Sequence, residues 1–365
     1  MKQMPLSQPY HNQGLTIVEL LVAMALAILM LGVSAQVYMT NKATYNNTEA
    51  LARIQENGRF AIEFLTKEIR MAGFIGCQVN SIANTINDVS GDWKFDFNNS
   101  VLGYEGGVDT FPAEVPADVI AGSDAIVISR GNDAGFYVDN HVGTSATIHT
   151  TETNDLKQGE ILMIVDCLAM QGGIFQRADT NINNTSSQVN HGTGASVSPG
   201  NCTKDLCGSF DCSDSSGAIT CDYDDDSKLL RMRNTIFYIA TSRNNRRGEA
   251  IPSLFHEYVT NNGSGGVTTV AQELVEGVEN FQILYGLDTD TTADGIANKY
   301  VTANNVTSWD KVASVRLFVL ARSIDPVGND ARPFTFMGTT TTPTDSYVRR
   351  QFTATIQVRN HGLGL

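Results

Sequence analysis

The chain has 365 residues and a formal net charge of −14. This acidic balance argues against autonomous nucleic-acid binding, which needs a basic face, and it suits a soluble surface that repels its neighbours. Beyond the apolar N-terminal stretch, about 290 residues remain, which is enough for one large or two small hydrophobic cores.

A short polar leader precedes a long apolar run. The junction reads Gly14-Leu15-Thr16-Ile17-Val18-Glu19, and no charged side chain lies between Leu20 and Asn41. As a helix, such a run spans a hydrocarbon core of about 30 Å. In a secretory signal peptide the apolar region lies before the cleavage site, whereas a cut at Gly14/Leu15 keeps it in the mature protein. A plain membrane anchor leaves Glu19 unexplained, since an ionisable group at the bilayer edge usually has a partner.

These residues resemble the class III signal of type IV prepilins, in which glycine is followed by an apolar residue and by glutamate five positions after the cut. The resemblance implies cleavage after Gly14 and N-methylation of Leu15 by a prepilin peptidase. It also implies that Glu19 pairs with the N-terminal amine of a neighbouring subunit, and a buried carboxylate does need a cationic partner. Family members often have phenylalanine where this chain has Leu15.

The helical pattern continues beyond the apolar run. One apolar stripe at three- and four-residue spacing comprises Leu51, Ile54, Gly58, Ala61, Leu65, Ile69 and Ala72. Gly73 follows the stripe and is a typical helix stop. We therefore expect one helix from Leu15 to about Ala72, with residues 15–41 in the membrane or filament core. Residues 42–73 would pack against a head formed by residues 74–365.

Two segments are more specific than an amphipathic pattern. Gln55-Glu56-Asn57-Gly58-Arg59-Phe60-Ala61 and Arg70-Met71-Ala72-Gly73-Phe74-Ile75-Gly76-Cys77 resemble the PilW family of type IV pilus minor pilins, as does the ELVEGVE and LYG pattern within 273–286. The resemblance covers residues 1–77 and much of 120–170 and 228–360. It implies an α+β, lollipop-shaped pilin fold, in which a long N-terminal helix packs on an antiparallel β-sheet head.

Strand signals begin after a loop-rich stretch from about Ser81 to Val119. Short apolar runs or alternating residues bounded by Gly, Asn or Asp predict strands at 124–130, 160–166, 228–241, 251–258, 267–275 and 278–285. Two longer strands, at 311–323 and 351–359, alternate with period two and read as half-buried antiparallel strands.

Six cysteines lie on the outer side of the predicted anchor: Cys77, Cys167, Cys202, Cys207, Cys212 and Cys221. An even count in an oxidising compartment favours disulfides, although six cysteines allow 15 pairings. The family pattern implies Cys77–Cys167, with two buried free thiols as the alternative. The other four lie in a polar insertion at 179–228, where two local disulfides are expected. Their spacing lacks the two-residue gaps typical of zinc sites.

Two acidic stretches are candidate cation sites. Asp288, Asp290, Asp294 and Asn298 have the character of a calcium loop, because carboxylates at alternating positions with a glycine for the turn suit Ca²⁺. The family has a more compact DxDxDG loop here, so a hydrated Asp turn is the competing interpretation. The run from Asp222 to Asp226 could also hold a hard cation, but it reads more simply as a solvated loop.

The motifs of common enzymes are absent: HExxH, the P-loop, GxSxG and CxxC do not occur. The expected function is therefore that of a non-enzymatic minor pilin without an obligatory cofactor. The resemblance implies an inner-membrane protein whose periplasmic head enters the surface pilus near its tip. Its partners would be other minor pilins, the major pilin, a large tip adhesin and the prepilin peptidase, without nucleic acid. Three alternatives stay open: a type II secretion pseudopilin, a DNA-uptake component of the pilus tip, and a membrane-anchored enzyme.

Overall fold

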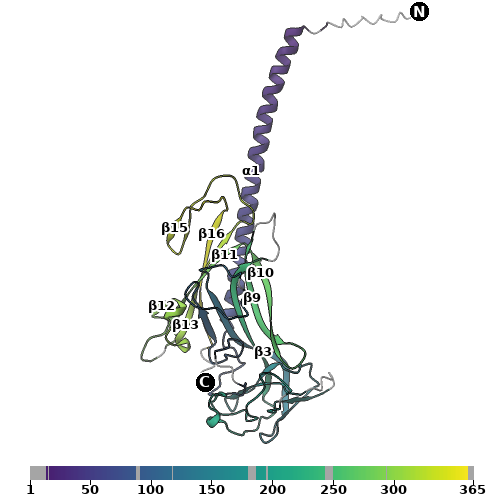
Figure 1. The fold of residues 1–365 in the computed structure, drawn as a ribbon, viewed down its shortest axis with the longest axis vertical. Coiled ribbons are helices and arrows are strands. Elements are labelled where there is room, and N and C mark those ends of the chain that lie inside the picture. Colours follow the sequence, from purple (N-terminus) through teal and green to yellow (C-terminus); the bar gives the residue numbers. More distant parts are fainter. Residues whose placement is uncertain are drawn as a thin grey trace, which may run out of the picture.

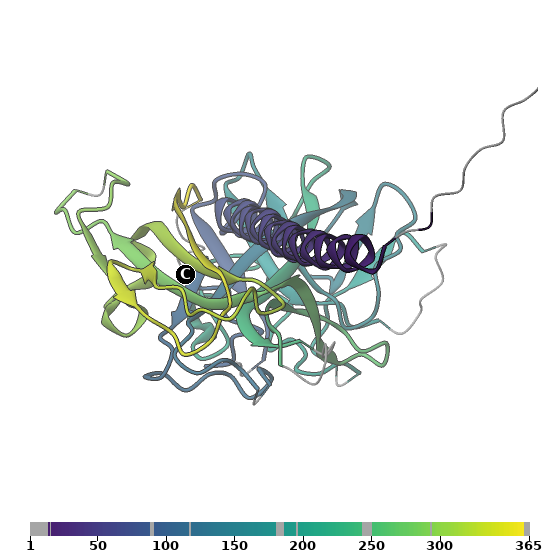
Figure 2. The same cartoon turned by 90° about the horizontal axis from the view of Figure 1, so that it is seen from above.

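The computed structural model describes residue 14 and residues 16–87, 91–116, 118–179, 186–194, 196–242, 250–292 and 294–360. Figure 1 shows a long helix whose first half projects from a β-rich head and whose second half lies against it. Seen from above in Figure 2, this helix lies along one side of the head. The arrangement is the α+β lollipop that the sequence predicted. One of its sheets is mixed, with a parallel pair of strands, and the other is antiparallel.

Helix α1 spans Ile17–Arg70, close to the predicted 15–72. Thr16 and Glu19 form a capping box at its start, and Lys67 and Arg70 in its last turn suit the negative end of the helix dipole. The predicted stripe begins to be buried at Ile54. Gly58 is needed for this packing, since an added Cβ would lie 2.1 Å from the Phe352 ring.

A ten-stranded sheet forms the larger part of the described head. Its main path runs β1-β6-β5-β8-β3-β4-β7, while β2 pairs with β3, β9 with β8, and β10 with β9. Its strands are β1 Ser81–Asn84, β2 Val101–Tyr104, β3 Ala125–Asn140, β4 Thr147–Thr150, β5 Ile161–Asp166, β6 Gln171–Gln176, β7 Gln188–Asn190, β8 Lys228–Thr241, β9 Pro252–Asn261 and β10 Val267–Glu276.

The stretch predicted to be loop-rich, 81–119, contains two of these strands, β1 and β2. β1 runs parallel to β6, so the head is not wholly antiparallel as expected. The rest of the stretch carries aromatic side chains that cover the large sheet: Trp93, Phe95 and Phe97 join Val127, Met163 and Ile236 in one core. Loops rich in Asn and Asp are thus held in place by a few large apolar side chains.

A four-stranded antiparallel sheet, in the order β12-β11-β13-β16, forms the second layer. Its strands are β11 Val278–Leu287, β12 Lys299–Val301, β13 Val312–Arg322 and β16 Arg349–Gln357, and a separate hairpin pairs β14 Phe334–Phe336 with β15 Thr339–Thr341. Short 3₁₀ turns occupy Ser215–Gly217, Ala303–Asn305 and Trp309–Lys311. The two long strands predicted near the C-terminus correspond to β13 and β16.

The main core lies where α1 and the two sheets meet. Helix residues Ala61, Leu65 and Ile69 share one buried cluster with side chains of both sheets, including Ile126, Phe237, Phe281, Leu317 and Ile356. The Glu68 carboxylate, 3.0 Å from Arg130 Nη2, adds an ion pair between α1 and β3. Burying this apolar stripe supplies most of the stability of such a helix.

The turn before β3 clamps the large sheet to β11. The backbone N–H of Asp124 donates to the Phe281 carbonyl, and its carboxylate accepts from the backbone N–H groups of Gly106 at 2.9 Å and Ile283 at 2.8 Å. Asp124 is 2% exposed. Burial raises its pKa to about 7, against the two amide hydrogen bonds, which lower it; nearby Glu105 and Asp109 raise it further.

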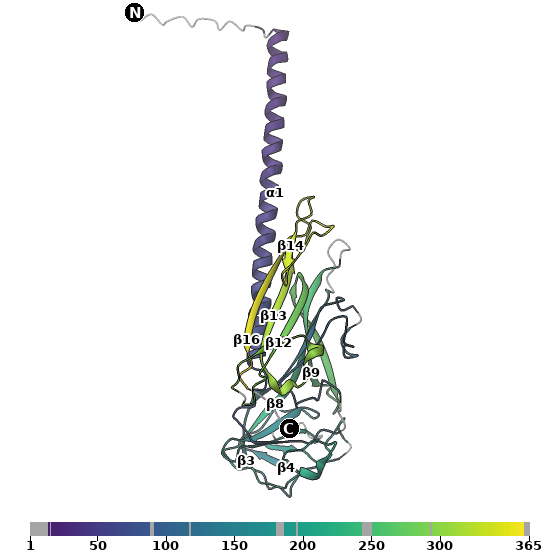
Figure 3. The same ribbon diagram turned by 90° about the vertical axis from the view of Figure 1, so that its left-hand side faces the viewer.

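The described residues of the insertion at 179–228 pack onto the head, at the end remote from the start of α1, near β3 and β4 in Figure 3. Disulfides join Cys202 to Cys212 and Cys207 to Cys221, so both bonds are local, as expected. The segment shares a core with the sheet through Val189, Leu206 and Tyr223. His191 of the insertion contacts His141 of the loop after β3, with 3.2 Å between the two Nε2 atoms. Burial lowers the pKa of His191 to about 3.

The third disulfide joins Cys77 to Cys167, the pair implied by the family pattern, with the Cα atoms 5.8 Å apart. It ties the segment just after α1 to the turn after β5 and closes a loop of 90 residues. The structure places all six cysteines in disulfides, so no thiol is left to bind a metal.

Replacing both Cys77 and Cys167 by serine should lower the free energy of unfolding by about 2–4 kcal/mol, because the unfolded chain regains the entropy of a long open loop. Thermal melting of the full chain in detergent would measure this change. The control is serine replacement of Cys202 and Cys212, whose disulfide closes a loop of only 10 residues. This replacement should lower the free energy of unfolding by less. Equal losses in the two variants would contradict the entropic argument.

The raised pKa of Asp124 predicts a pH-dependent head. A carboxyl with a folded-state pKa of about 7 and an ordinary value of 3.8 stabilises the fold fully below pH 3.8, and this contribution is lost as the pH rises to about 7. Asp124→Asn should therefore flatten the fall in unfolding free energy between pH 4 and 7. Exposed Asp118→Asn removes the same charge and should leave that fall unchanged. Identical pH profiles for Asp124→Asn and the unchanged chain would rule out this assignment.

Candidate functional site

The start of α1 carries the residues predicted for processing and assembly. Gly14 is described and exposed, Leu15 lies outside the described residues, and Glu19 is exposed in the first turn of α1. In this single chain the Glu19 carboxylate accepts from Thr16, at 3.0 Å from the backbone N and 2.9 Å from Oγ1. Both bonds go to Oε2, so within the described residues Oε1 stays open to a cation from a neighbouring chain.

The first half of α1 presents apolar side chains to its surroundings on every side. Within the described residues, α1 is the one helix long and apolar enough to cross a membrane, and no part of its apolar window is buried. The exposed side chains include Ile17, Leu21, Leu26, Met30 and Val37, each more than half exposed. A fully apolar helix of this length needs lipid or other helices around it.

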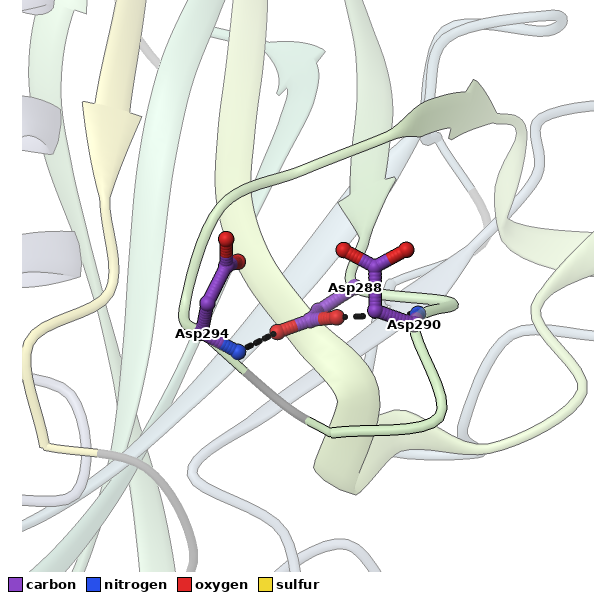
Figure 4. A group of neighbouring side chains, drawn as sticks. All are labelled: Asp288, Asp290 and Asp294. Carbon is purple, nitrogen blue, oxygen red and sulfur yellow. Dashed lines mark hydrogen bonds between the residues drawn. The ribbon is translucent and has the colours of Figure 1, made fainter.

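The predicted calcium loop lies between β11 and β12, where Asp288 directly follows β11. Figure 4 shows Asp288, Asp290 and Asp294 gathered at this loop. One carboxylate oxygen from each of the three lies within 4.8 Å of the others. Asp288 is buried, whereas Asp290 and Asp294 are exposed. The structure therefore brings together the three predicted carboxylates, two of them open to solvent.

Asp288 also organises the turn. Its carboxylate accepts from the backbone N–H groups of Asp290 at 3.1 Å, Asp294 at 2.9 Å and Gly295 at 2.8 Å. Such bonds are typical of an Asp turn. They fold the loop so that Asp290 and Asp294 lie on either side of Asp288, an arrangement that spacing alone does not reveal.

Asn298 lies beside this cluster but is engaged with the loop. Its Oδ1 accepts from the Thr289 backbone N–H at 2.8 Å, and its Nδ2 donates to Asp290 Oδ2 at 3.2 Å. A cation at the three carboxylates would therefore meet the amide nitrogen of Asn298 unless the amide turned over. With six to eight oxygen ligands the usual number for Ca²⁺, water would complete the shell.

His256 and Glu257 are the one histidine and acidic residue that are adjacent in the sequence. Strand β9, which carries both, points their side chains to opposite faces of the sheet. His256 packs against Phe64 of α1 at 6.0 Å between ring centroids, while the Glu257 carboxylate accepts from the Tyr238 hydroxyl at 3.3 Å. Successive strand residues point to opposite faces, so these two groups cannot act together on one substrate.

The buried carboxylate of Asp124 is a polar residue that the sequence did not single out. The only signal for it is an Asp directly before an apolar strand, a common arrangement at strand starts. Its importance comes from Gly106 and Ile283, which lie 18 and 159 residues away in sequence. No local pattern could have identified these partners.

Comparison with known proteins shows a family similarity in the second half of the head. Residues 236–360 match the family model of PilW, the type IV pilus-assembly protein W. This range contains the end of β8, strands β9 to β13 and β16, and it leaves out the insertion at 179–228. The motifs at 55–61 and 70–77 lie outside the matched range.

A pilin-like protein of Thermus thermophilus, PilA3, is 33% identical over 62 residues. The match covers 17% of this chain and 27% of the relative, so this chain spans about a quarter of the length of that relative. The chain is thus similar to PilW over residues 236–360 and to a pilin-like protein over 62 residues.

Proposed function

We propose that the protein is a minor pilin that primes assembly of a type IV pilus. One observation carries the proposal: an exposed apolar helix with a single carboxylate at its start is joined to a head that matches PilW. The helix provides an anchor and a means of packing with other helices. The head, which is covered by polar loops and carries three disulfides, suits an extracytoplasmic environment.

The proposed mechanism begins with cleavage after Gly14 by a prepilin peptidase, followed by methylation of Leu15. The apolar half of α1 then holds the subunit in the inner membrane with its head in the periplasm. On assembly this half transfers into the filament core, where its exposed side chains pack against those of other subunits. Glu19 would pair with the N-terminal amine of a neighbour, which fixes the register between subunits.

The partners proposed for this step are other minor pilins, the major pilin and a large tip adhesin, in a complex near the pilus tip that supports adhesion and twitching motility. The role is structural and needs no catalytic group. A pseudopilin of a type II secretion system would use the same helix chemistry, and the test below separates the two. The net charge of −14 disfavours direct DNA binding at the tip.

We also propose that Asp288, Asp290 and Asp294 form a weak Ca²⁺ site. Its support is the gathering of three carboxylates within 4.8 Å at a turn that Asp288 already organises. Asp290 and Asp294 would be the accessible ligands and Asp288 the buried one. Binding would relieve the repulsion between the three negative charges and rigidify the loop before β12.

Clean deletion of the gene should abolish surface pili or make them sparse while protein secretion stays normal, because the filament would lack an initiating subunit. Electron microscopy of surface pili and a comparison of secreted proteins measure the two outcomes. Complementation with the unchanged gene should restore pili, and complementation with Glu19→Ala should not. Normal pili with a secretion defect would contradict the proposal and favour a pseudopilin.

The calcium site predicts that Ca²⁺ raises the melting temperature of the full chain in detergent. At a tenfold excess over its dissociation constant, a ligand adds about 1.4 kcal/mol to the unfolding free energy. Calorimetric titration would measure the binding, and replacing Asp290 and Asp294 by asparagine should abolish it. Asn replacement of Asp118 and Asp330, exposed acids outside both acidic stretches, is the matched control. The absence of both heat and a melting shift at millimolar Ca²⁺ would exclude the site.

A further inference from the structure

A groove of about 590 Å³ lies on the head, beside the last turns of α1. One wall is the helix surface from Ile62 to Arg70, and the other is formed by Phe74 and by Arg359 and Asn360, which follow β16. The groove thus joins the end of the helix to the end of the last strand. No local sequence pattern predicts this groove, since its two walls lie almost 300 residues apart in the chain.

The groove is held open by hydrogen bonds that fix its walls. The Asn360 side chain donates to the Ala72 carbonyl at 3.2 Å, and the Gly131 backbone N–H donates to the Phe74 carbonyl at 2.7 Å. Gly73 is in the left-handed region, with φ +71°, and a Cβ there would lie 2.2 Å from the Asn360 carbonyl oxygen. A preformed groove of this kind costs a ligand little free energy of ordering.

Three cations line this groove in a chain of net charge −14. Lys67, Arg70 and Arg359 are exposed, and within the described part of the chain none of them has an acidic side chain within ion-pair distance. By contrast, Arg130, Arg177, Arg231, Arg322 and Arg349 all form ion pairs. The acid that lines the groove, Glu63, lies 3.8 Å from Arg59. The groove is therefore a local excess of positive charge.

The helix dipole explains why two of these cations lie at this position. Lys67 and Arg70 lie in the last turn of α1, where cations interact favourably with the carbonyl end of the helix. Arg359 comes from a different element, the segment that follows β16. Half-buried Ile62, Met71 and Phe74 form an apolar floor between the cations. The site therefore combines guanidinium and ammonium donors with a place for an apolar side chain.

The position of the groove excludes lipid head groups as its ligand. Lys67 lies 26 residues beyond Asn41, the end of the uncharged run, which is about 39 Å along a helix axis. This is further than surface charges act across water at physiological ionic strength. The complementary ligand must then be a soluble anion or an anionic segment of another macromolecule.

We propose that this groove binds an acidic segment of a partner protein, with carboxylates on Lys67, Arg70 and Arg359 and a large apolar side chain on Met71 and Phe74. Arginine pairs well with carboxylates because its planar donors can contact both oxygens. The apolar floor distinguishes such a segment from a free inorganic anion. The surface is separate from the apolar half of α1, so the inference goes beyond the helix-mediated assembly role.

The test uses the full chain in detergent and a fluorescein-labelled peptide, Asp-Glu-Phe-Glu-Asp, followed by fluorescence anisotropy. Replacing Lys67, Arg70 and Arg359 by glutamate should weaken binding at least about tenfold, which corresponds to about 1.4 kcal/mol. The control replaces exposed Lys299, Lys311 and Arg350 by glutamate and makes the same change in net charge elsewhere. It should change binding less than about twofold, and circular dichroism with thermal melting would verify that both variants fold.

Two further peptides test the chemistry of the site. Lys-Arg-Phe-Arg-Lys should not bind, and Asp-Glu-Gly-Glu-Asp should bind more weakly than the parent peptide because it cannot use the apolar floor. Equal binding by the groove variant and the unchanged chain would overturn the proposal, as would the lack of saturable binding at about 1 mM peptide. Tighter binding of a single-stranded DNA oligonucleotide, lost in the groove variant, would replace the acidic segment by nucleic acid as the ligand.

Discussion

The second half of α1 packs against two sheets at once, and the arrangement of the head depends on that contact. The face of the large sheet that points away from α1 is covered by the aromatic loop around Trp93. The small sheet has only four described strands. The helix stripe of Ala61, Leu65 and Ile69 closes the space between them. At Gly58 the approach is so close that no larger residue fits beside Phe352. A glycine in this helix therefore serves packing, despite its cost of about 1 kcal/mol in helix propensity.

The same helix serves two environments along its length. From Ile17 to Met39 it exposes apolar side chains in every direction, and from Ile54 onward it buries one stripe and exposes charged residues such as Arg59 and Glu63. The first pattern suits lipid or a bundle of identical helices, and the second suits a folded head. Under the proposed function, this division would allow one subunit to move from a membrane into a filament without refolding, since only the exposed half would change its neighbours.

Periodic segments were predictable from the sequence, and long-range partnerships were not. The limits of α1, β8, β13 and β16 follow from period-3.6 or period-2 patterns that continue over many residues. β1 and β2 were missed because each has only four residues in a polar stretch, and their pairing with β6 and β3 depends on residues far away in sequence. The acidic loop was found from its spacing, but the three backbone bonds to Asp288 appear only in the fold. For the same reason the groove between Lys67 and Arg359 has no signature in the chain.

The position of the Cys77–Cys167 disulfide in the fold determines how the subunit transmits a pulling force. A subunit held by its helix and pulled by its head carries tension across the junction where α1 ends, seven residues before Cys77. The covalent bond passes that tension directly to the turn after β5, which lies between β6 and β8 in the large sheet. Under load, the chain between the two cysteines is bypassed, and the force is resisted by the hydrogen bonds that β5 makes with these two neighbours.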